Sequence, residues 1–259
     1  MNLQLEGKRA LVTGSTAGIG FAIAEALANE GASVIVNGRT QKRVDDALQK
    51  LHGKVEGIAA DLAIAEGADK VARRYPEVDI LVNNLGIFEV RPFEQIDDDD
   101  WRRFFETNVM SGVRMSRHYL PGMKQRDWGR IIFISSESGV QIPSEMVHYG
   151  MTKTAQIAVA RGLAETTKGT NVTVNSVLPG PTASEGAGNF VKSMAQAQKI
   201  DEAAVEREFF KSVRPSSLIR RFSRIEEVAA LVAFVASPLS SSTNGAALRV
   251  DGGVVQSIL

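Results

Sequence analysis

Three polar residues in the middle of the chain have the types and spacing of a proton-transfer group. Tyr149 and Lys153 are four residues apart in a stretch with helical character, so both side chains lie on one side, a single turn apart. A free phenol is a poor base at neutral pH, and a nearby ammonium favours its ionised form. Ser136 follows an apolar strand, where catalytic groups gather in a parallel sheet, and its hydroxyl can hydrogen-bond a substrate oxygen. Together they predict acid–base chemistry at an oxygen atom.

Asn108 and His148 are further candidates. Asn108 lies inside a long helical stretch, where asparagine has a lower propensity than alanine or leucine, and a kink with a bound water would explain it. His148 precedes Tyr149, but adjacent helix positions point in different directions, so we expect His148 to line a substrate pocket. The three histidines of the chain show no metal-ligand spacing, and no metal site is expected.

A glycine-rich turn, Thr13-Gly14-Ser15-Thr16-Ala17-Gly18-Ile19-Gly20, lies between the first expected strand and the first expected helix. Glycines there permit a tight turn and the close approach of a pyrophosphate, whose charge the helix N-terminus favours. Many loops need glycine for other reasons, so position is what strengthens the signal. The spacing is GxxxGxG, which differs from the GxGxxG dinucleotide fingerprint.

The elements that must position these residues follow from apolar stretches that alternate with helical ones. The expected strands are Lys8–Thr13, Ser33–Asn37, Val55–Ala59, Val78–Val82, Arg130–Ile134, Val172–Val177 and Ala247–Val250. The expected helices are Ile19–Glu30, Gln41–Leu51, a stretch ending near Arg74, Asp97 to about Lys124, Val147–Thr167 and Ile225–Ala236. Nearly all-apolar strands separated by helices predict an α/β fold, a doubly wound parallel sheet of about seven strands with helices on both faces.

The chain has no long linker rich in Pro, Gly and Ser, so we expect residues 1–259 to form a single domain. Residues from Ala183 to about Pro215 interrupt the strand–helix alternation. This insertion at about 183–215 is either a lid over a substrate or an ordinary pair of packing helices. The acidic run Asp97–Asp100 stands where a helix should begin, and N-capping explains it better than a metal site does.

Composition and charge exclude several classes of function. The 30 basic and 30 acidic residues balance, which argues against a broad surface for nucleic acid or anionic membrane. The absence of cysteine excludes disulfides, thiolate catalysis and cysteine-ligated metals. The longest apolar stretch, Val228–Ala236, is too short to span a membrane, and no secretory signal region precedes the first strand. We expect a cytoplasmic protein.

The glycine-rich turn resembles the cofactor motif of the short-chain dehydrogenase/reductase family, and the resemblance extends over nearly the whole chain. The other motifs in the family's order and approximate spacing are Asp61, Asn83-Asn84-Leu85-Gly86, Asn108, Ser136, Tyr149-x-x-x-Lys153, Pro179-Gly180 and Asp251-Gly252-Gly253. Leu85 stands where the family usually has alanine, which leaves its neighbours intact. The resemblance implies a Rossmann-like fold and an NAD(P)-dependent enzyme that interconverts a carbonyl and an alcohol by hydride transfer, with tyrosine as general acid–base.

The resemblance also implies roles for individual residues. The implied catalytic residues are Asn108, Ser136, Tyr149 and Lys153, with Asn108 holding a water that links Lys153 to solvent. The implied cofactor-binding residues are Gly14, Ser15, Thr16, Gly18, Ile19, Gly20, Arg39, Asp61, Leu62, Asn84, Gly86, Tyr149, Lys153, Pro179, Gly180 and Thr182. The expected substrate-binding residues are Ser136, Ser138, Gln141, His148 and Tyr149.

Arg39 indicates which cofactor is preferred. It ends the second strand, where an enzyme that prefers NAD carries an acidic side chain for the ribose hydroxyls. A guanidinium can pair with the 2′-phosphate of NADP, which a carboxylate would repel. We therefore expect NADP(H), unless Arg39 is only a solvated surface residue, with NAD(H) as the alternative cofactor.

Two other functions stay open. One is an NAD-dependent dehydrogenase of the same family, and the other is a non-catalytic cofactor-binding sensor, against which the intact Ser136, Tyr149 and Lys153 count. The expected partners are a small carbonyl or alcohol substrate and further copies of the chain in a tetramer or dimer, as is common in the family. Neither nucleic acid nor membrane is expected as a partner.

Overall fold

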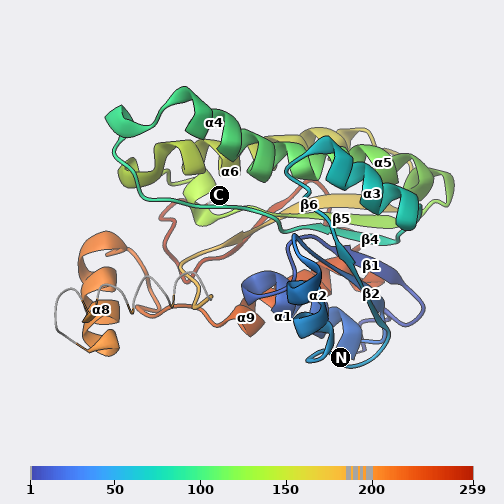
Figure 1. Ribbon diagram of the computed structural model, residues 1–259, viewed down its shortest axis with the longest axis horizontal. Coiled ribbons are helices and arrows are strands. Elements are labelled where there is room, and N and C mark those ends of the chain that lie inside the picture. Colours follow the sequence, from blue (N-terminus) through green and yellow to red (C-terminus); the bar gives the residue numbers. More distant parts are fainter. Residues whose placement is uncertain (1, 185–187, 189–191, 193–194, 197–200, 259) are drawn as a thin grey trace.

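The computed structural model describes residues 2–184, 188, 192, 195–196 and 201–258. Its centre is one sheet of seven parallel strands in the order β3-β2-β1-β4-β5-β6-β7 (Figure 1). The strands are β1 (Arg9–Val12), β2 (Ser33–Gly38), β3 (Val55–Ala59), β4 (Ile80–Asn83), β5 (Gly129–Ile134), β6 (Val172–Pro179) and β7 (Ala247–Val250). The predicted Rossmann-like, doubly wound sheet is confirmed.

Helices cover both faces of this sheet (Figure 1). On one face lie α1 (Gly18–Asn29), α2 (Gln41–Leu48) and α9 (Ile225–Ala236). On the other lie α3 (Ala65–Arg74), α5 (Ser111–Gln125) and α6 (Val147–Glu165). Successive side chains of a strand point to opposite faces, so Val12 packs into the first core and Leu11 into the second. Both faces of the sheet pack against apolar cores, which is why polar and apolar residues do not alternate along most of the strands.

The helix predicted from Asp97 to about Lys124 is interrupted. Its first part, α4 (Asp98–Phe105), begins as predicted with a capping acid, because the Asp97 carboxylate accepts a hydrogen bond from the Asp100 amide at 2.8 Å. A π-helical turn, η2 (Glu106–Met110), then separates α4 from α5 and contains Asn108. Such a turn disturbs the regular ladder of helical hydrogen bonds and frees backbone groups for other partners.

The segments that carry chemistry follow the carboxyl ends of the strands. Because the strands are parallel, these ends meet at one edge of the sheet, where open α/β folds bind ligands. The glycine-rich turn follows β1 and Arg39 follows β2, while Asn84, Ser136 and Thr182 come after β4, β5 and β6. Residues far apart in sequence are therefore neighbours in space.

The stretch 183–215 lies partly outside the described residues. Its described part includes α8 (Glu202–Glu208) and a second π-helical turn, η5 (Phe209–Val213). Helix α8 stands apart from the two helical layers (Figure 1). A small apolar cluster of its own, formed by Ala195, Val205 and Phe222, holds it there.

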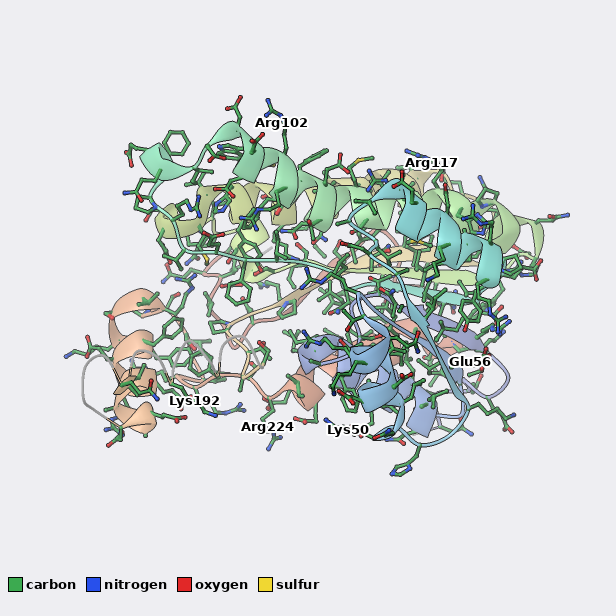
Figure 2. The ribbon with its side chains drawn as sticks, viewed as in Figure 1. Lys50, Glu56, Arg102, Arg117, Lys192 and Arg224 are labelled. Atoms are coloured by element: carbon green, nitrogen blue, oxygen red, sulfur yellow. The ribbon has the colours of Figure 1, made fainter. Side chains whose placement is uncertain are left out.

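Charged side chains of both signs cover the outside of the molecule. Lys50, Arg102 and Arg224 project outward from different elements (Figure 2). Within the described part of the chain, no helix is long and apolar enough to cross a membrane.

Candidate active site

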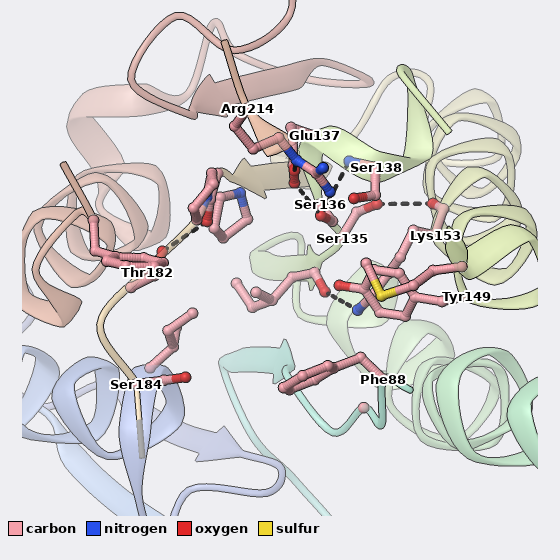
Figure 3. Close-up of a pocket in the computed structure, with 18 of the residues that line it drawn as sticks. Phe88, Ser135, Ser136, Glu137, Ser138, Tyr149, Lys153, Thr182, Ser184 and Arg214 are labelled. Atoms are coloured by element: carbon pink, nitrogen blue, oxygen red, sulfur yellow. Dashed lines mark hydrogen bonds and ion pairs between the residues drawn. The ribbon is translucent and has the colours of Figure 1, made fainter. Parts of the chain in front are cut away.

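A cavity of ≈ 560 Å³ opens at the carboxyl edge of the sheet. Segments after β4, β5 and β6 line it, together with α6 and the described end of the 183–215 stretch. Figure 3 shows Tyr149 and Lys153 reaching it from α6, and Phe88 opposite Arg214 and Glu137. The cavity thus brings the predicted Ser136, Tyr149 and Lys153 together with residues that the sequence did not single out.

Lys153 is buried, and its ammonium group donates two hydrogen bonds. The side chain is 5% exposed, and Nζ donates hydrogen bonds to the Ile134 carbonyl at 3.0 Å and to Gln156 Oε1 at 3.1 Å. Burial lowers the pKa of Lys153 to about 8, and the carboxylate of Glu137 opposes this shift in part. Nζ lies 5.6 Å from the centre of the Tyr149 ring, on the same side of the helix.

The pKa of Tyr149 depends on burial and on neighbouring charges other than that of Lys153. Burial of the phenol raises its pKa well above the usual value, and the Glu137 carboxylate adds to this effect. A hydrogen bond with Ser136 and the charge of Arg214 work in the opposite direction. This differs from the expectation that Lys153 sets the pKa. The protonated phenol at neutral pH is suited to giving a proton to a substrate oxygen.

Asn108 is buried beside Lys153, and a side chain of α6 links the two residues. Its side chain is held by Ile87, whose amide donates to Oδ1 at 2.8 Å and whose carbonyl accepts from Nδ2 at 3.0 Å. Its backbone carbonyl accepts a hydrogen bond from Gln156 Nε2 at 2.5 Å. The amide of Gln156 therefore joins the Asn108 carbonyl to the Lys153 ammonium. Gln156 was missed, although its place one turn after Lys153 on the same helix was a usable signal.

The two neighbouring serines have different partners. The Ser135 hydroxyl donates to the Lys153 carbonyl at 2.7 Å and ties β5 to α6. The Ser136 hydroxyl donates to the Glu137 carboxylate, and its oxygen accepts from the Ser138 amide at 3.1 Å. Ser136, Glu137 and Ser138 all line the cavity.

An ion-pair group occupies the wall next to Ser136. Arg214 Nε lies 3.4 Å from Glu137 Oε1, and Nη1 lies 3.2 Å from Glu145 Oε1. Only 12% of the Arg214 side chain and 6% of the Glu137 side chain are exposed. None of these three residues was predicted from the sequence. Glu137 directly follows Ser136 and could have been noticed, whereas Arg214 is distant in sequence and gave no signal.

The glycine-rich turn has the shape of a phosphate cradle. Gly14 and Gly18 adopt left-handed φ values of +60° and +57°. A Cβ on Gly20 would lie 2.4 Å from Asn84 Nδ2 and 2.6 Å from the Gly14 carbonyl, so no larger side chain fits. Ala17, the N-cap of α1, offers no side-chain cap, and the first turn carries no acidic residue. The helix N-terminus is thus suited to a negatively charged pyrophosphate.

The expected adenosine-binding residues lie along the same edge. Arg39 is exposed directly after β2. The preceding Gly38 leaves room for Thr16, because a Cβ on residue 38 would lie 2.4 Å from Thr16 Cγ2. The Asp61 carboxylate accepts a hydrogen bond from the Ala63 amide at 3.0 Å. The side chain of Leu62 is buried in the core, so only its backbone is available to a ligand.

Two predicted substrate contacts lie outside the main cavity. His148 is completely buried, with its ring centre 3.9 Å from that of Phe104 and 6.1 Å from that of Trp101. It points toward α4 because it is one helix position away from Tyr149. Gln141 lines a neighbouring cavity. The structure thus corrects the expectation for both residues, while Ser138 does line the main cavity.

The remaining expected residues are in place around the cavity. Its lining includes Ile19, Gly86, Pro179, Gly180 and Thr182.

No group of three or more histidine, aspartate or glutamate residues that could hold a metal ion occurs in the part of the chain that the structure describes.

Comparison with known proteins decides the family. Residues 8–195 match the family model described as short chain dehydrogenase. The chain belongs to the short-chain dehydrogenase/reductase family. It is therefore an oxidoreductase that acts on alcohol or carbonyl groups with a nicotinamide cofactor, and the resemblance seen in the sequence is confirmed.

Members of this family resemble the chain over its full length. The uncharacterized oxidoreductase YvaG of Bacillus subtilis is 50% identical, with all of both chains covered. D-beta-hydroxybutyrate dehydrogenase of Cupriavidus necator is 35% identical over 97% of this chain and 99% of its own. Among solved structures, L-sorbose reductase of Gluconobacter frateurii, complexed with NADPH and L-sorbose, has a TM-score of 0.93 and 31% identity over all of both chains.

Proposed function

We propose that this family member is an NADP(H)-dependent carbonyl reductase or alcohol dehydrogenase in which Tyr149 is the general acid–base. The observation that carries the proposal is the meeting of Tyr149, Lys153 and Ser136 at one cavity beside the glycine-rich turn. Bound NADPH supplies the hydride in the reducing direction. The residues of the chain supply position, charge and the proton.

The proposed catalytic steps follow from the positions of the side chains. Ser136 turns its hydroxyl from Glu137 toward the substrate carbonyl and polarises it. Tyr149, which its raised pKa keeps protonated at neutral pH, then gives its phenolic proton to the oxygen as negative charge develops there. Lys153, held by Ile134 and Gln156, places a positive charge beside this transfer. Asn108 acts through the amide of Gln156, which fixes the ammonium in position.

The preference for NADP(H) rests on Arg39. Its exposed guanidinium at the end of β2 can pair with a 2′-phosphate, and neighbouring Thr16 can add a hydroxyl contact. The glycine-rich turn would hold the pyrophosphate, and Asp61 with the backbone of Leu62 would border the adenine. The presence of NADPH in the L-sorbose reductase structure supports this assignment.

We further propose that residues 1–259 act as one domain and that the stretch 183–215 covers the substrate. Phe209, Val213 and Arg214, from the described part of this stretch, line the cavity. Assembly into a tetramer or dimer remains a prediction, which light scattering on the purified protein would test.

A cofactor and substrate screen tests the proposed function. The purified protein is titrated with NADPH and NADH, and a panel of ketones and alcohols is then screened for turnover of each cofactor. We expect tighter binding of NADPH and its oxidation by at least one carbonyl compound. Tight binding of NADPH without turnover of any compound would instead support the cofactor-binding sensor.

A further inference from the structure

We propose that the substrate is a neutral α-hydroxy carbonyl compound, in which a hydroxyl group stands on the carbon next to the carbonyl. This inference rests on the proposed function, because it takes Ser136 and Tyr149 as the groups that bind the reacting oxygen. It comes from the ion-pair group of Glu137, Arg214 and Glu145, which lines the same cavity and whose side chains neither give nor take the transferred proton.

Glu137 places a buried acceptor next to the reacting oxygen. It directly follows Ser136 and is 5% exposed, and one carboxylate oxygen accepts the Ser136 hydroxyl while the other faces Arg214. An ionised carboxylate has about four lone-pair positions, so these contacts leave positions for a further donor. Neighbouring hydroxyl and carbonyl oxygens of a substrate are separated by roughly 2.8 Å, about the length of one hydrogen bond. When Ser136 turns its hydroxyl to the carbonyl, the Glu137 oxygen that it leaves can accept a hydrogen bond from a hydroxyl on the adjacent carbon.

The charges in the cavity disfavour an anionic substrate. Two carboxylates, Glu137 and Glu145, share the one guanidinium of Arg214. Lys153 is the other cation among the described lining residues, and its ammonium already donates to a carbonyl and to an amide. A keto acid would add a third carboxylate to a cavity whose two cations already donate hydrogen bonds to other partners. A neutral hydroxyl group meets acceptors instead.

The other walls suit a carbon skeleton. Phe88 lies edge-on to Tyr149 with ring centres 6.4 Å apart, and Phe209 stacks on Phe222 at 5.1 Å on another side of the cavity. The substrate thus presents oxygens to Ser136, Tyr149 and Glu137 and C–H groups to the rings. In the reduction, the carbonyl carbon gains the hydride supplied by NADPH and the oxygen gains the Tyr149 proton. The products are a vicinal diol and NADP⁺.

Two matched sets of ketones test this inference. The aromatic set is α-hydroxyacetophenone, acetophenone and phenylglyoxylate, and the aliphatic set is acetoin, butanone and acetoacetate. We expect kcat/KM with NADPH to be roughly 10- to 100-fold higher for the α-hydroxy ketone than for the plain ketone of the same set, the range for a hydrogen bond to a charged group. The keto acids should be the poorest substrates. A second readout is ligand-observed NMR in the presence of NADP⁺, in which phenylethylene glycol should bind more tightly than phenylethanol.

Two variants separate the hydroxyl contact from the charge. Glu137→Gln should lose most of the preference for α-hydroxy ketones and gain activity toward keto acids. Glu145→Gln, at the far end of Arg214, should gain activity toward keto acids but keep the hydroxyl preference. Equal kcat/KM for the plain and hydroxylated ketones in the unmodified protein, or keto acids as the best substrates, would overturn this inference alone. No turnover of any of the six ketones, with NADPH binding intact, would overturn the proposed function instead.

Discussion

The amide oxygen of Gln156 accepts a hydrogen bond from Lys153 Nζ at 3.1 Å, while its nitrogen donates to the backbone carbonyl of Asn108. An amide that bonds at both ends thus connects the π-helical turn to the ammonium and fixes the position of Lys153.

Replacement of Gln156 should move the pH range of activity. Gln156→Met removes the acceptor that stabilises the ammonium, so we expect the pKa of Lys153 to fall by about one unit, the value of one charge-assisted hydrogen bond. The loss of reductase activity on the alkaline side should then begin at lower pH. Gln156→Glu should shift it to higher pH, because a carboxylate favours the ammonium. The measurement is kcat/KM against pH, and identical profiles for the three proteins would contradict this role.

Tyr149→Phe should remove catalysis and leave cofactor binding intact. The ring and its contact with Phe88 remain, but the proton donor is lost, so we expect kcat to fall at least about 100-fold. The dissociation constant for NADPH, measured by fluorescence titration, should change little. Substantial residual activity would show that another group donates the proton.

Arg39→Asp should reverse the cofactor preference. Loss of the guanidinium and repulsion by the new carboxylate should weaken NADPH binding roughly 100-fold, whereas NADH binding should change little or improve. Lys50→Asp, an equal charge change at an exposed position beyond α2, is the matched control. Equal effects of Arg39→Asp on the two cofactors would contradict the 2′-phosphate contact.

Lys153 should make stability depend on pH between about 8 and 10.5. In this window the folded state has released the Lys153 proton while the unfolded chain still holds it, so unfolding takes up a proton and the free energy of unfolding rises with pH. Relative to Lys153→Met, the unmodified protein should gain about 1.4 kcal/mol per pH unit, or about 3 kcal/mol across the window. Urea unfolding of both proteins at several pH values measures this difference. A constant difference would show that the pKa of Lys153 is not lowered.

Gly20→Ala should damage both the fold and the cofactor site. The added Cβ would collide with Asn84 Nδ2 and with the Gly14 carbonyl, so we expect a loss of about 1–3 kcal/mol in the free energy of unfolding and weaker NADPH binding. Gly162→Ala in α6 is the control, since among the described residues only chain neighbours and the backbone of the helix itself lie near a Cβ there. That change should stabilise the protein by about 0.5–1 kcal/mol. Similar effects of the two substitutions would argue against the tight packing at Gly20.

The sequence was sufficient for the sheet because local composition determines its elements. Apolar strands such as Ile131–Ile134 can only be buried between two helical layers, and glycine at Gly14 and Gly18 agrees with the left-handed conformations found there. A kink at Asn108 was expected, but the π-helical form of η2 was not, since its residues have no distinctive propensity and tertiary contacts with α6 support it.

Contacts between distant segments account for the misses in the site. His148 was placed in the pocket because nothing local shows that Phe104 of α4 would cover its ring. Arg214 reaches Glu137 across 77 positions of sequence, a pairing that no local pattern encodes. Gln156 and Glu137 could have been found from the sequence, unlike Arg214, because each stands within three residues of a predicted catalytic residue.

The π-helical turn η2 has a consequence for how this chain tolerates changes of length. It accommodates one residue more than a regular turn, and each residue of an α-helix rotates the chain by about 100°. Deletion of one residue between 106 and 110 would restore a continuous helix and draw the Asn108 carbonyl back into the helical ladder, away from Gln156. A shortening that improves the regularity of the helix would thus disconnect it from the proton-transfer group.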